Sequence, residues 1–183
     1  MNSKREIFIS VDVETAGPIP GKYSLLAIGA CVVFDDAEIF TCQIKPTTRN
    51  AVPEALAVTG LSMEILEQEG LAPAEAMQKF RNWILHVIGS NGTPIFVGFN
   101  AAFDWSFINY YFHHYIGENP FGFAALDIKS LYMGFAKCSW KQTKSSQIAA
   151  SLHPKSSGTH DALQDARYQA ELFRLIRPDY SDY

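Results

Sequence analysis

The sequence of 183 residues is 48% hydrophobic and 13% aromatic, which fits one globular domain, since domains typically span about 100 to 200 residues. The net charge of −4 disfavours a nucleic-acid partner at first sight, because phosphate binding usually leaves a basic footprint. No stretch approaches the roughly 20 consecutive apolar residues of a membrane span, and no secretory signal is visible. Cys31, Cys42 and Cys138 form no CxxC pair, which argues against a disulfide framework and a zinc site. We expect a cytoplasmic protein without membrane contact.

The first part of the chain predicts three strands. Residues 7–14 alternate between two faces in the manner of a strand. Two further β-rich runs, residues 25–34 and 38–45, are separated by Asp-Asp-Ala at 35–37, which we expect to form the turn. Three strands with short connections indicate an antiparallel meander.

The rest of the chain predicts alternating helices and strands. Residues 75–88 carry apolar side chains at helical spacing. Residues 93–100 resemble a buried strand that runs into an aromatic-rich helix over 101–117. A short strand near 123–128 and a closing helix over 160–176 follow. The order of elements predicts an α/β fold with a mixed sheet and helices packed against it.

Four carboxylates occupy unexpected positions on these elements. Asp12 and Glu14 lie two residues apart on the first strand, about 6.6 Å along the chain, and can share one metal ion. Asp104 falls in the first turn of the aromatic-rich helix, which we expect Asn100 to cap. Asp165 lies on the apolar stripe of the closing helix, where an unpaired charge would be costly. A metal ion shared by these acids would explain all of them.

Each position also has an ordinary explanation. A D-x-E pair is common at a solvated strand end, a carboxylate in a first turn gains from the helix dipole, and lysine or arginine could pair with Asp165. His160 follows Ser-Ser-Gly-Thr, a flexible stretch suited to a mobile catalytic side chain, but could be an ordinary loop histidine.

Two surface features have two interpretations each. A lysine cluster interleaved with Trp140 either follows a phosphate backbone and stacks a base or is a solvated loop face; its members are Lys137, Lys141, Lys144 and Lys155. The aromatic run 110–112 belongs either to the core or to a homodimer contact. The adjacent His113 and His114 point about 100° apart on a helix and make a poor metal pair.

In order, Asp12 and Glu14 in DVET, Asp104 in NAAFD, and His160 and Asp165 in HDALQDA resemble the DEDDh exonuclease family. That family includes polymerase proofreading subunits, ribonuclease T, oligoribonucleases and TREX enzymes. The resemblance covers nearly the whole chain. It implies one exonuclease domain over residues 1–183 with a ribonuclease H-like α/β fold, in which a mixed five-stranded sheet, three antiparallel strands and then parallel strands, is flanked by helices.

The resemblance also implies a reaction and its residues. Single-stranded DNA or RNA would be hydrolysed from the 3′ end to nucleoside 5′-monophosphates with two Mg²⁺ or Mn²⁺ ions. Asp12, Glu14 and Asp165 would hold the metals, Asp104 would support the second directly or through water, and His160 would be the general base. The implied substrate-binding residues are Thr15, Ala16, Tyr23, Asn100 and Phe103. Without the four carboxylates, Asp and Glu equal Lys and Arg in number, so the negative charge is a weak objection.

Departures from the family concern the substrate and the partners. Residues 58–61, Val-Thr-Gly-Leu, stand where many members have Val-His-Gly-Ile, which we interpret as structural. The tail with which proofreading subunits bind their polymerase is absent, so we expect a stand-alone exonuclease without a polymerase partner. DNA as substrate, RNA as substrate (a ribonuclease T-like or oligoribonuclease-like enzyme) and a catalytically silent nucleic-acid-binding domain are the three alternatives.

Overall fold

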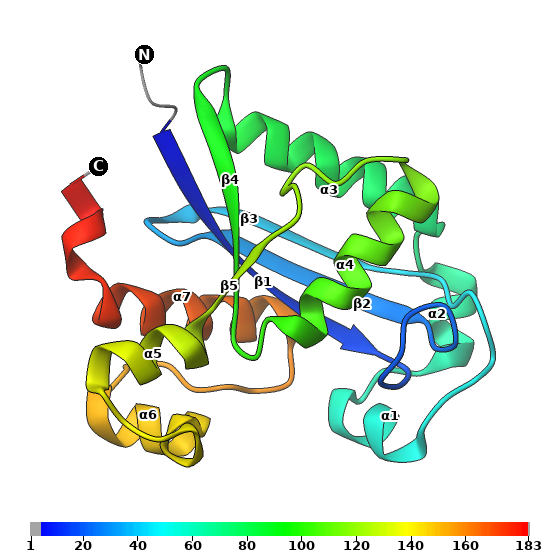
Figure 1. The fold of residues 1–183 in the computed structure, drawn as a ribbon. Coiled ribbons are helices and arrows are strands. Elements are labelled where there is room, and N and C mark those ends of the chain that lie inside the picture. The colour runs from blue at the N-terminus through cyan, green and yellow to red at the C-terminus, as the bar shows by residue number, and fades with distance from the viewer. Residues whose placement is uncertain (1–4, 183) are drawn as a thin grey trace.

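The computed structural model describes residues 5–182 and has a mixed five-stranded sheet at its centre (Figure 1). The strand order is β3-β2-β1-β4-β5. The β1–β2 and β2–β3 pairs are antiparallel, and the β1–β4 and β4–β5 pairs are parallel, which confirms the predicted sheet. The strands are β1 (Arg5–Thr15), β2 (Leu25–Val32), β3 (Asp35–Gln43), β4 (Gly92–Gly98) and β5 (Ala125–Asp127).

Helices cover both faces of the sheet, with α3 and α4 on one face and α5 and α7 on the other (Figure 1). The helices predicted over 75–88, 101–117 and 160–176 are present as α3, α4 and α7. Within residues 5–182, no helix is long and apolar enough to cross a membrane. The helices are α1 (Pro53–Thr59), α2 (Met63–Glu69), α3 (Pro73–Ile88), α4 (Ala102–Tyr115), α5 (Ile128–Ala136), α6 (Ser145–Leu152) and α7 (Ala162–Ile176), with 3₁₀ turns η1 (Trp140–Thr143) and η2 (Pro178–Asp182).

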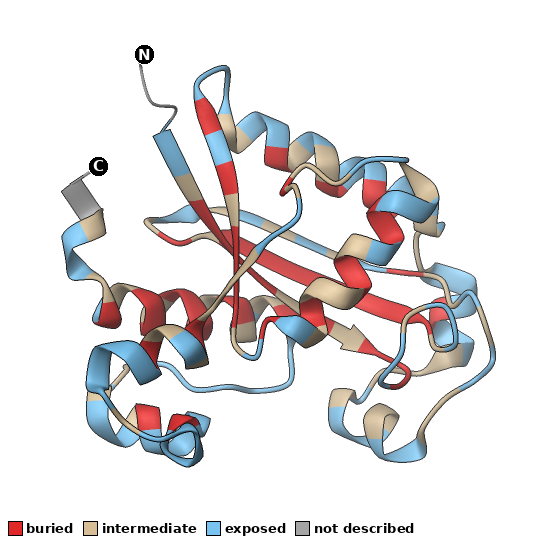
Figure 2. Cartoon of the chain, in the orientation of Figure 1, coloured by how far each residue is buried: buried red, intermediate tan, exposed pale blue. Residues whose placement is uncertain are grey.

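The two faces of β1 belong to two hydrophobic cores, and most residues of the central strands β1 and β2 are buried (Figure 2). Ile9, Val11 and Val13 pack beneath α3 and α4. Phe8 points to the opposite face, where its ring lies 5.0 Å from that of Phe173 on α7. Because side chains alternate along a strand, Asp12 and Glu14 share the face of Phe8, so the two acids lie on the side covered by α7.

A glycine in β2 lets α7 approach the sheet closely. Gly29 pairs with Asp12 across the β1–β2 ladder. A Cβ atom at Gly29 would lie 2.1 Å from the backbone carbon of Ala162, the first residue of α7. The missing side chain therefore brings the first turn of α7 against the strand pair next to the acids.

The turn between β2 and β3 differs from the prediction. Asp35, Asp36 and Ala37 belong to β3, and the turn is formed by Val33 and Phe34. Val33 is fully buried and the ring of Phe34 lies 6.4 Å from that of Phe8, so packing holds apolar residues in the turn. The acidic residues lie on the exposed edge strand, where charged side chains are common.

The start of α4 also differs from the prediction. Asn100 does not cap the helix; Ala101 is the N-cap residue and makes no side-chain cap hydrogen bond. Asn100 has a φ of 61°, a left-handed conformation that asparagine adopts more readily than most residues. The backbone N–H of Ala101 donates to Asp127 at the end of β5, so a neighbouring strand holds this turn.

Candidate active site

Three carboxylates from β1 and α7 meet at one point. One carboxylate oxygen from each of Asp12, Glu14 and Asp165 lies within 4.8 Å of the others. The parallel pairing of β4 with β1 ends at Ser10, so the last residues of β1 extend beyond β4. Two strand acids on one face and one helix acid in a first turn thus converge beside the end of the sheet.

Asp165 also organises the loop before its own helix. Its Oδ1 accepts a hydrogen bond from the backbone N–H of Thr159 at 2.6 Å, and its Oδ2 accepts one from His160 at 3.1 Å. Asp165 is only partly buried, so the severe burial expected from its helical stripe is absent. The side chain therefore has donors of its own, in addition to the acids that it faces.

Asp104 lies behind this cluster and is 4% exposed. Its Oδ1 accepts a hydrogen bond of 3.1 Å from the backbone N–H of Val13. That N–H faces the side on which β4 no longer pairs with β1, and a buried backbone donor needs a partner. Asp104 therefore replaces a missing ladder bond and joins α4 to β1 between Asp12 and Glu14.

Burial and neighbouring negative charges disfavour ionisation at the centre of the cluster. Burial, followed by the charges of Asp165, Asp104 and Asp161, raises the pKa of Glu14 to about 8. Burial also raises the pKa of Asp104 to about 7, against two backbone hydrogen bonds that favour its carboxylate. The pKa of Asp12 is raised by burial first and then by Asp104, Glu14 and Asp165. Hard oxygen donors that repel one another suit a divalent cation such as Mg²⁺ or Mn²⁺, so the donor set fits the expected metals.

Gln169 is a buried polar residue that the sequence prediction missed. It is 4% exposed, its Nε2 donates to Asp12 Oδ1 at 2.5 Å, and its Oε1 accepts from the backbone N–H of Phe99 at 3.0 Å. One side chain of α7 thereby joins β1 to the residue after β4. Gln169 lies four residues after Asp165 and therefore on the same helix face. This spacing was the signal in the sequence that could have identified it.

His160 lies at the exposed end of the loop before α7. It has a φ of 60°, and its backbone is bound by Asp165. Earlier in the same loop, Lys155 and Ser156 donate to the carboxylate of Glu171 on α7. The loop expected to be flexible is thus attached to α7 at two points, and His160 is exposed to solvent next to Asp165.

The expected substrate-binding residues fall into different environments. Ala16 is fully buried, and both its N–H and its C=O bond to other backbone groups, of Ser24 and Val52. It therefore shapes the loop after β1 and presents no surface to a ligand. Thr15 is 6% exposed and its hydroxyl donates to Gly17.

The other three expected residues are more open. Tyr23 and Phe103 are partly exposed and Asn100 is exposed. Tyr23 packs against Gly17, where a Cβ atom would lie 2.6 Å from its ring, so this glycine seats the tyrosine beside the loop after β1. Phe103 lies in the first turn of α4, next to Asp104.

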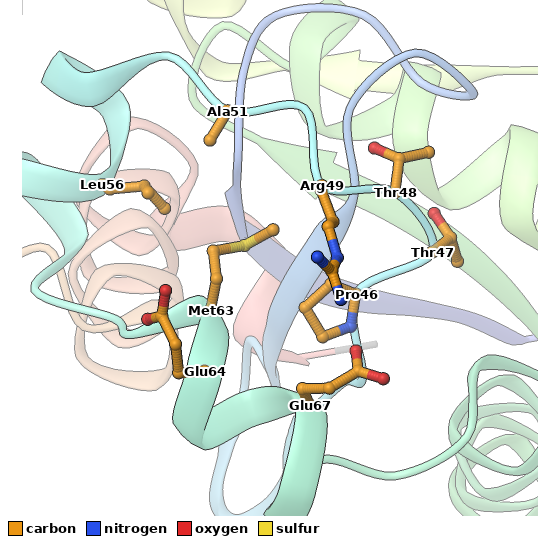
Figure 3. Close-up of a pocket in the computed structure, with 9 residues that line it drawn as sticks. All are labelled: Pro46, Thr47, Thr48, Arg49, Ala51, Leu56, Met63, Glu64 and Glu67. Atoms are coloured by element: carbon orange, nitrogen blue, oxygen red, sulfur yellow. The ribbon is translucent and has the colours of Figure 1, made fainter.

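A pocket of about 580 Å³ lies near this loop but away from the acids. Residues 46–49, Ala51, Leu56 of α1 and three residues of α2 line it (Figure 3). Ala51, Leu56 and Met63 also pack against the cluster that contains Ala16. None of the four carboxylates lines the pocket, so the pocket is separate from the acidic cluster.

Comparison with known proteins agrees with this geometry. The family described as Exonuclease matches residues 9–173, a span that contains all five residues of the motif set. The 3′-5′ DNA exonuclease Cap18 of Escherichia coli is 60% identical over 176 residues, which cover 96% of this chain and 94% of that protein.

Two solved structures show the same fold. The nuclease domain of 3′hExo, a DEDDh family member bound to rAMP, aligns with a TM-score of 0.78 at 15% identity, over 98% of this chain and 95% of that one. E. coli exonuclease I in complex with a dA16 oligonucleotide aligns with a TM-score of 0.73 at 16% identity, over 98% of this chain and 43% of that one. With the Exonuclease match and the 60% identical relative, these findings place the chain in the DEDDh family, and it is a 3′-5′ exonuclease.

Proposed function

We propose that this exonuclease removes nucleotides one at a time from the 3′ end of single-stranded DNA and releases nucleoside 5′-monophosphates. The observation that carries the proposal is the convergence of Asp12, Glu14 and Asp165 within 4.8 Å. DNA is the preferred substrate because the 60% identical E. coli relative is a DNA exonuclease. The rAMP-bound neighbour is only 15% identical and supports the fold alone.

The DEDDh family depends on divalent metal ions, and the acidic cluster provides ligands for them. Asp12, Glu14 and Asp165 would hold two Mg²⁺ or Mn²⁺ ions, with Asp104 supporting the second directly or through water. When bound, these cations supply the positive charge that stabilises an in-line displacement at phosphorus. The raised pKa values of Glu14 and Asp104 support this assignment, because a cation stabilises carboxylates whose charged form is disfavoured by burial and, at Glu14, also by neighbouring acids.

His160 would act as the general base and accept the proton of the attacking water at a ring nitrogen. Its exposed position beside Asp165 allows an imidazole to reach a water molecule at the acidic cluster. Thr15, Tyr23, Asn100 and Phe103 would border the terminal nucleotide, with the two partly exposed aromatic rings available for stacking on a base. Ala16 would contribute indirectly, by holding the loop after β1 in place.

The test is a product-length assay with 5′-labelled single-stranded DNA and RNA of the same sequence. We expect stepwise shortening of DNA with Mg²⁺ or Mn²⁺ and none with a chelator. RNA shortened as fast as DNA would contradict the DNA preference, because the 2′-hydroxyl is the group that distinguishes the two. Binding of the strand without any product under either metal would point to a catalytically silent binding domain.

The same assay tests His160. Replacing a general base typically lowers the rate by about 10² to 10⁴, so we expect His160→Ala to lose at least about 10² in kcat with little change in KM. His153→Ala is the matched control, because His153 also has a left-handed backbone conformation and lies in the same loop. Full activity of His160→Ala would remove His160 from this role.

A further inference from the structure

The segment from α5 to the loop before α7 differs in charge from the rest of the chain. Residues 128–160 contain five lysines and neither Asp nor Glu. Elsewhere the chain has ten Lys and Arg against nineteen Asp and Glu. The segment forms α5, η1 and α6, which lie together on the side of α7 (Figure 1). We call the surface formed by its lysines and Trp140 the basic face; the lysines are Lys129, Lys137, Lys141, Lys144 and Lys155.

The basic face displays an aromatic ring among its charges. The side chain of Trp140 is 52% exposed, and the ammonium group of Lys129 lies 4.3 Å from its ring centroid. A cation over an indole ring is attracted to the ring and restricts its motion. The other four lysines are exposed. An exposed indole beneath a lysine, in a segment that has five lysines and no Asp or Glu of its own, differs from an ordinary solvated segment, in which both signs of charge mix.

A chain of contacts links the basic face to the acidic cluster. The ammonium group of Lys129 also lies 5.9 Å from the ring centroid of Phe99, whose backbone N–H is bound by Gln169. Gln169 in turn donates to Asp12. At its other end the segment leads to His160, whose backbone is bound by Asp165. One end of the basic segment is therefore linked to Asp12 through Phe99 and Gln169, and the other end borders Asp165.

We propose that the basic face binds the substrate strand on the 5′ side of the scissile phosphate, a role that rests on the proposed function. Its lysines would neutralise successive phosphates, and Trp140 would stack on a base of the strand. Single-strand binding proteins combine these two elements, a basic path for the backbone and aromatic rings for the bases. The terminal nucleotide would lie at the acidic cluster, while the basic face would hold nucleotides further along the strand.

The test measures binding of fluorescein-labelled dT20 by anisotropy in an Asp12→Asn background with Mg²⁺, where turnover is expected to be slow. Lys141→Glu/Lys144→Glu is compared with Lys45→Glu/Lys79→Glu, which makes the same charge change at exposed lysines outside the basic face. We expect Kd to rise at least tenfold for the first pair and less than twofold for the second. The slope of log Kd against log salt should fall by about 0.7 for each lost phosphate contact. Equal Kd values for the two pairs would overturn the proposal.

Trp140 is tested by fluorescence, because the other tryptophans, Trp83 and Trp105, are partly buried in the opposite core. Binding of dT20 should quench the emission. Trp140→Phe should remove the quench and keep most of the affinity, since phenylalanine can stack, whereas Trp140→Ala should weaken binding about tenfold. An unchanged quench in Trp140→Phe, or full affinity in Trp140→Ala, would exclude the stacking role.

Two controls separate this proposal from its alternatives. Polyglutamate of similar length should bind at least tenfold more weakly than dT20, because it has charge without bases; equal binding would favour an acidic protein as the partner and overturn the proposal. The ratio of kcat/KM for dT20 to that for a trinucleotide should fall in the Lys141/Lys144 pair. Full hydrolysis by Asp12→Asn would refute the assigned active site, whereas the comparison of the two lysine pairs would still test the basic face.

Discussion

The two faces of β1 show how one strand serves both packing and chemistry. On one face, Ile9, Val11 and Val13 are buried beneath α3 and α4 in a core of aliphatic and aromatic side chains. On the other, Asp12 and Glu14 follow Phe8 toward the open end of the sheet, and polar groups of α7 meet them. The apolar face fixes the strand, and the acidic face stores repulsion that a cation can relieve. Substitutions on the two faces should therefore separate stability from activity.

The largest expected effect is on activity and comes from the acidic face. Asp12→Asn should lower kcat/KM by on the order of 10³, because loss of a metal ligand removes several kcal/mol of transition-state stabilisation. It should leave the melting temperature of the metal-free protein equal or higher, because one repelling charge is gone. Ile9→Val on the apolar face should lower the free energy of unfolding by about 1 kcal/mol with unchanged kcat/KM. Glu69→Gln, an exposed acid at the end of α2, controls for loss of a negative charge. An Asp12→Asn variant that loses stability and keeps its activity would contradict the assignment of activity to the acidic face and stability to the apolar face.

Gln169 connects the two regions, and its replacement should have the next largest effect. Gln169→Leu keeps the volume but removes the bonds to Asp12 and Phe99. Partners that orient a metal ligand are typically worth about 10- to 100-fold in affinity or activity. We therefore expect a decrease of that size in kcat/KM and in the Mn²⁺ affinity, which calorimetry measures in the absence of substrate. Gln169→Glu keeps the acceptor for Phe99 but adds a charge beside Asp12, which should raise the pKa of Asp12 further and shift the rate profile to higher pH. A purely structural role would predict lower stability with normal Mn²⁺ affinity.

The difference between the faces also explains which features could be predicted. Strict alternation in β1 shows the strand and places both acids on one side. For Gln169 the only signal was its position on the helix face of Asp165, and it was missed because an uncharged amide gives no sign of burial by itself. The turn at Val33 and Phe34 was missed because tertiary packing held apolar residues where Asp-Asp-Ala offered better turn chemistry.

The helices that were not predicted share a physical reason. The segments that form α1, α2, α5 and α6 have seven to nine residues, too few for the apolar period to stand out. Such short helices depend on tertiary contacts for stability. The short segments around the basic face therefore became visible only in the folded chain.

A methyl group at Gly29 should have a smaller effect, which lowers both the stability of the protein and its metal affinity. Gly29→Ala would place a carbon 2.1 Å from the backbone of Ala162, so α7 must move away from the sheet. Overpacking of this kind typically costs about 1–3 kcal/mol, and the shift would separate Asp165 from Asp12. We expect lower stability in urea denaturation together with reduced Mn²⁺ affinity. Gly134→Ala is the control, because a Cβ atom there meets nothing within 4 Å; equal behaviour of the two variants would mean that α7 does not rest on Gly29.

The smallest expected effect is the pH dependence of stability, and its sign follows from the acidic face. Glu14 has a pKa of about 8 in the folded metal-free protein against an ordinary value of 4.5, so the folded state retains a proton that the unfolded state releases. Its contribution to stability is complete below about pH 4.5 and is lost as the pH rises through about 8. Asp104, with a pKa raised from 3.8 to about 7, acts in the same direction.

Thermal melts of the chelator-treated protein should therefore show a lower melting temperature at pH 8.5 than at pH 6, by at least about 4 °C, since 1 kcal/mol corresponds to about 2–4 °C in a protein of this size. Mn²⁺ should raise the melting temperature more at pH 8.5, because protons no longer compete for the carboxylates. Glu14→Gln should flatten the dependence, whereas Glu69→Gln should not. A metal-free melting temperature that rises between pH 6 and 8.5 would mean that the acids on this face do not repel one another as their arrangement implies.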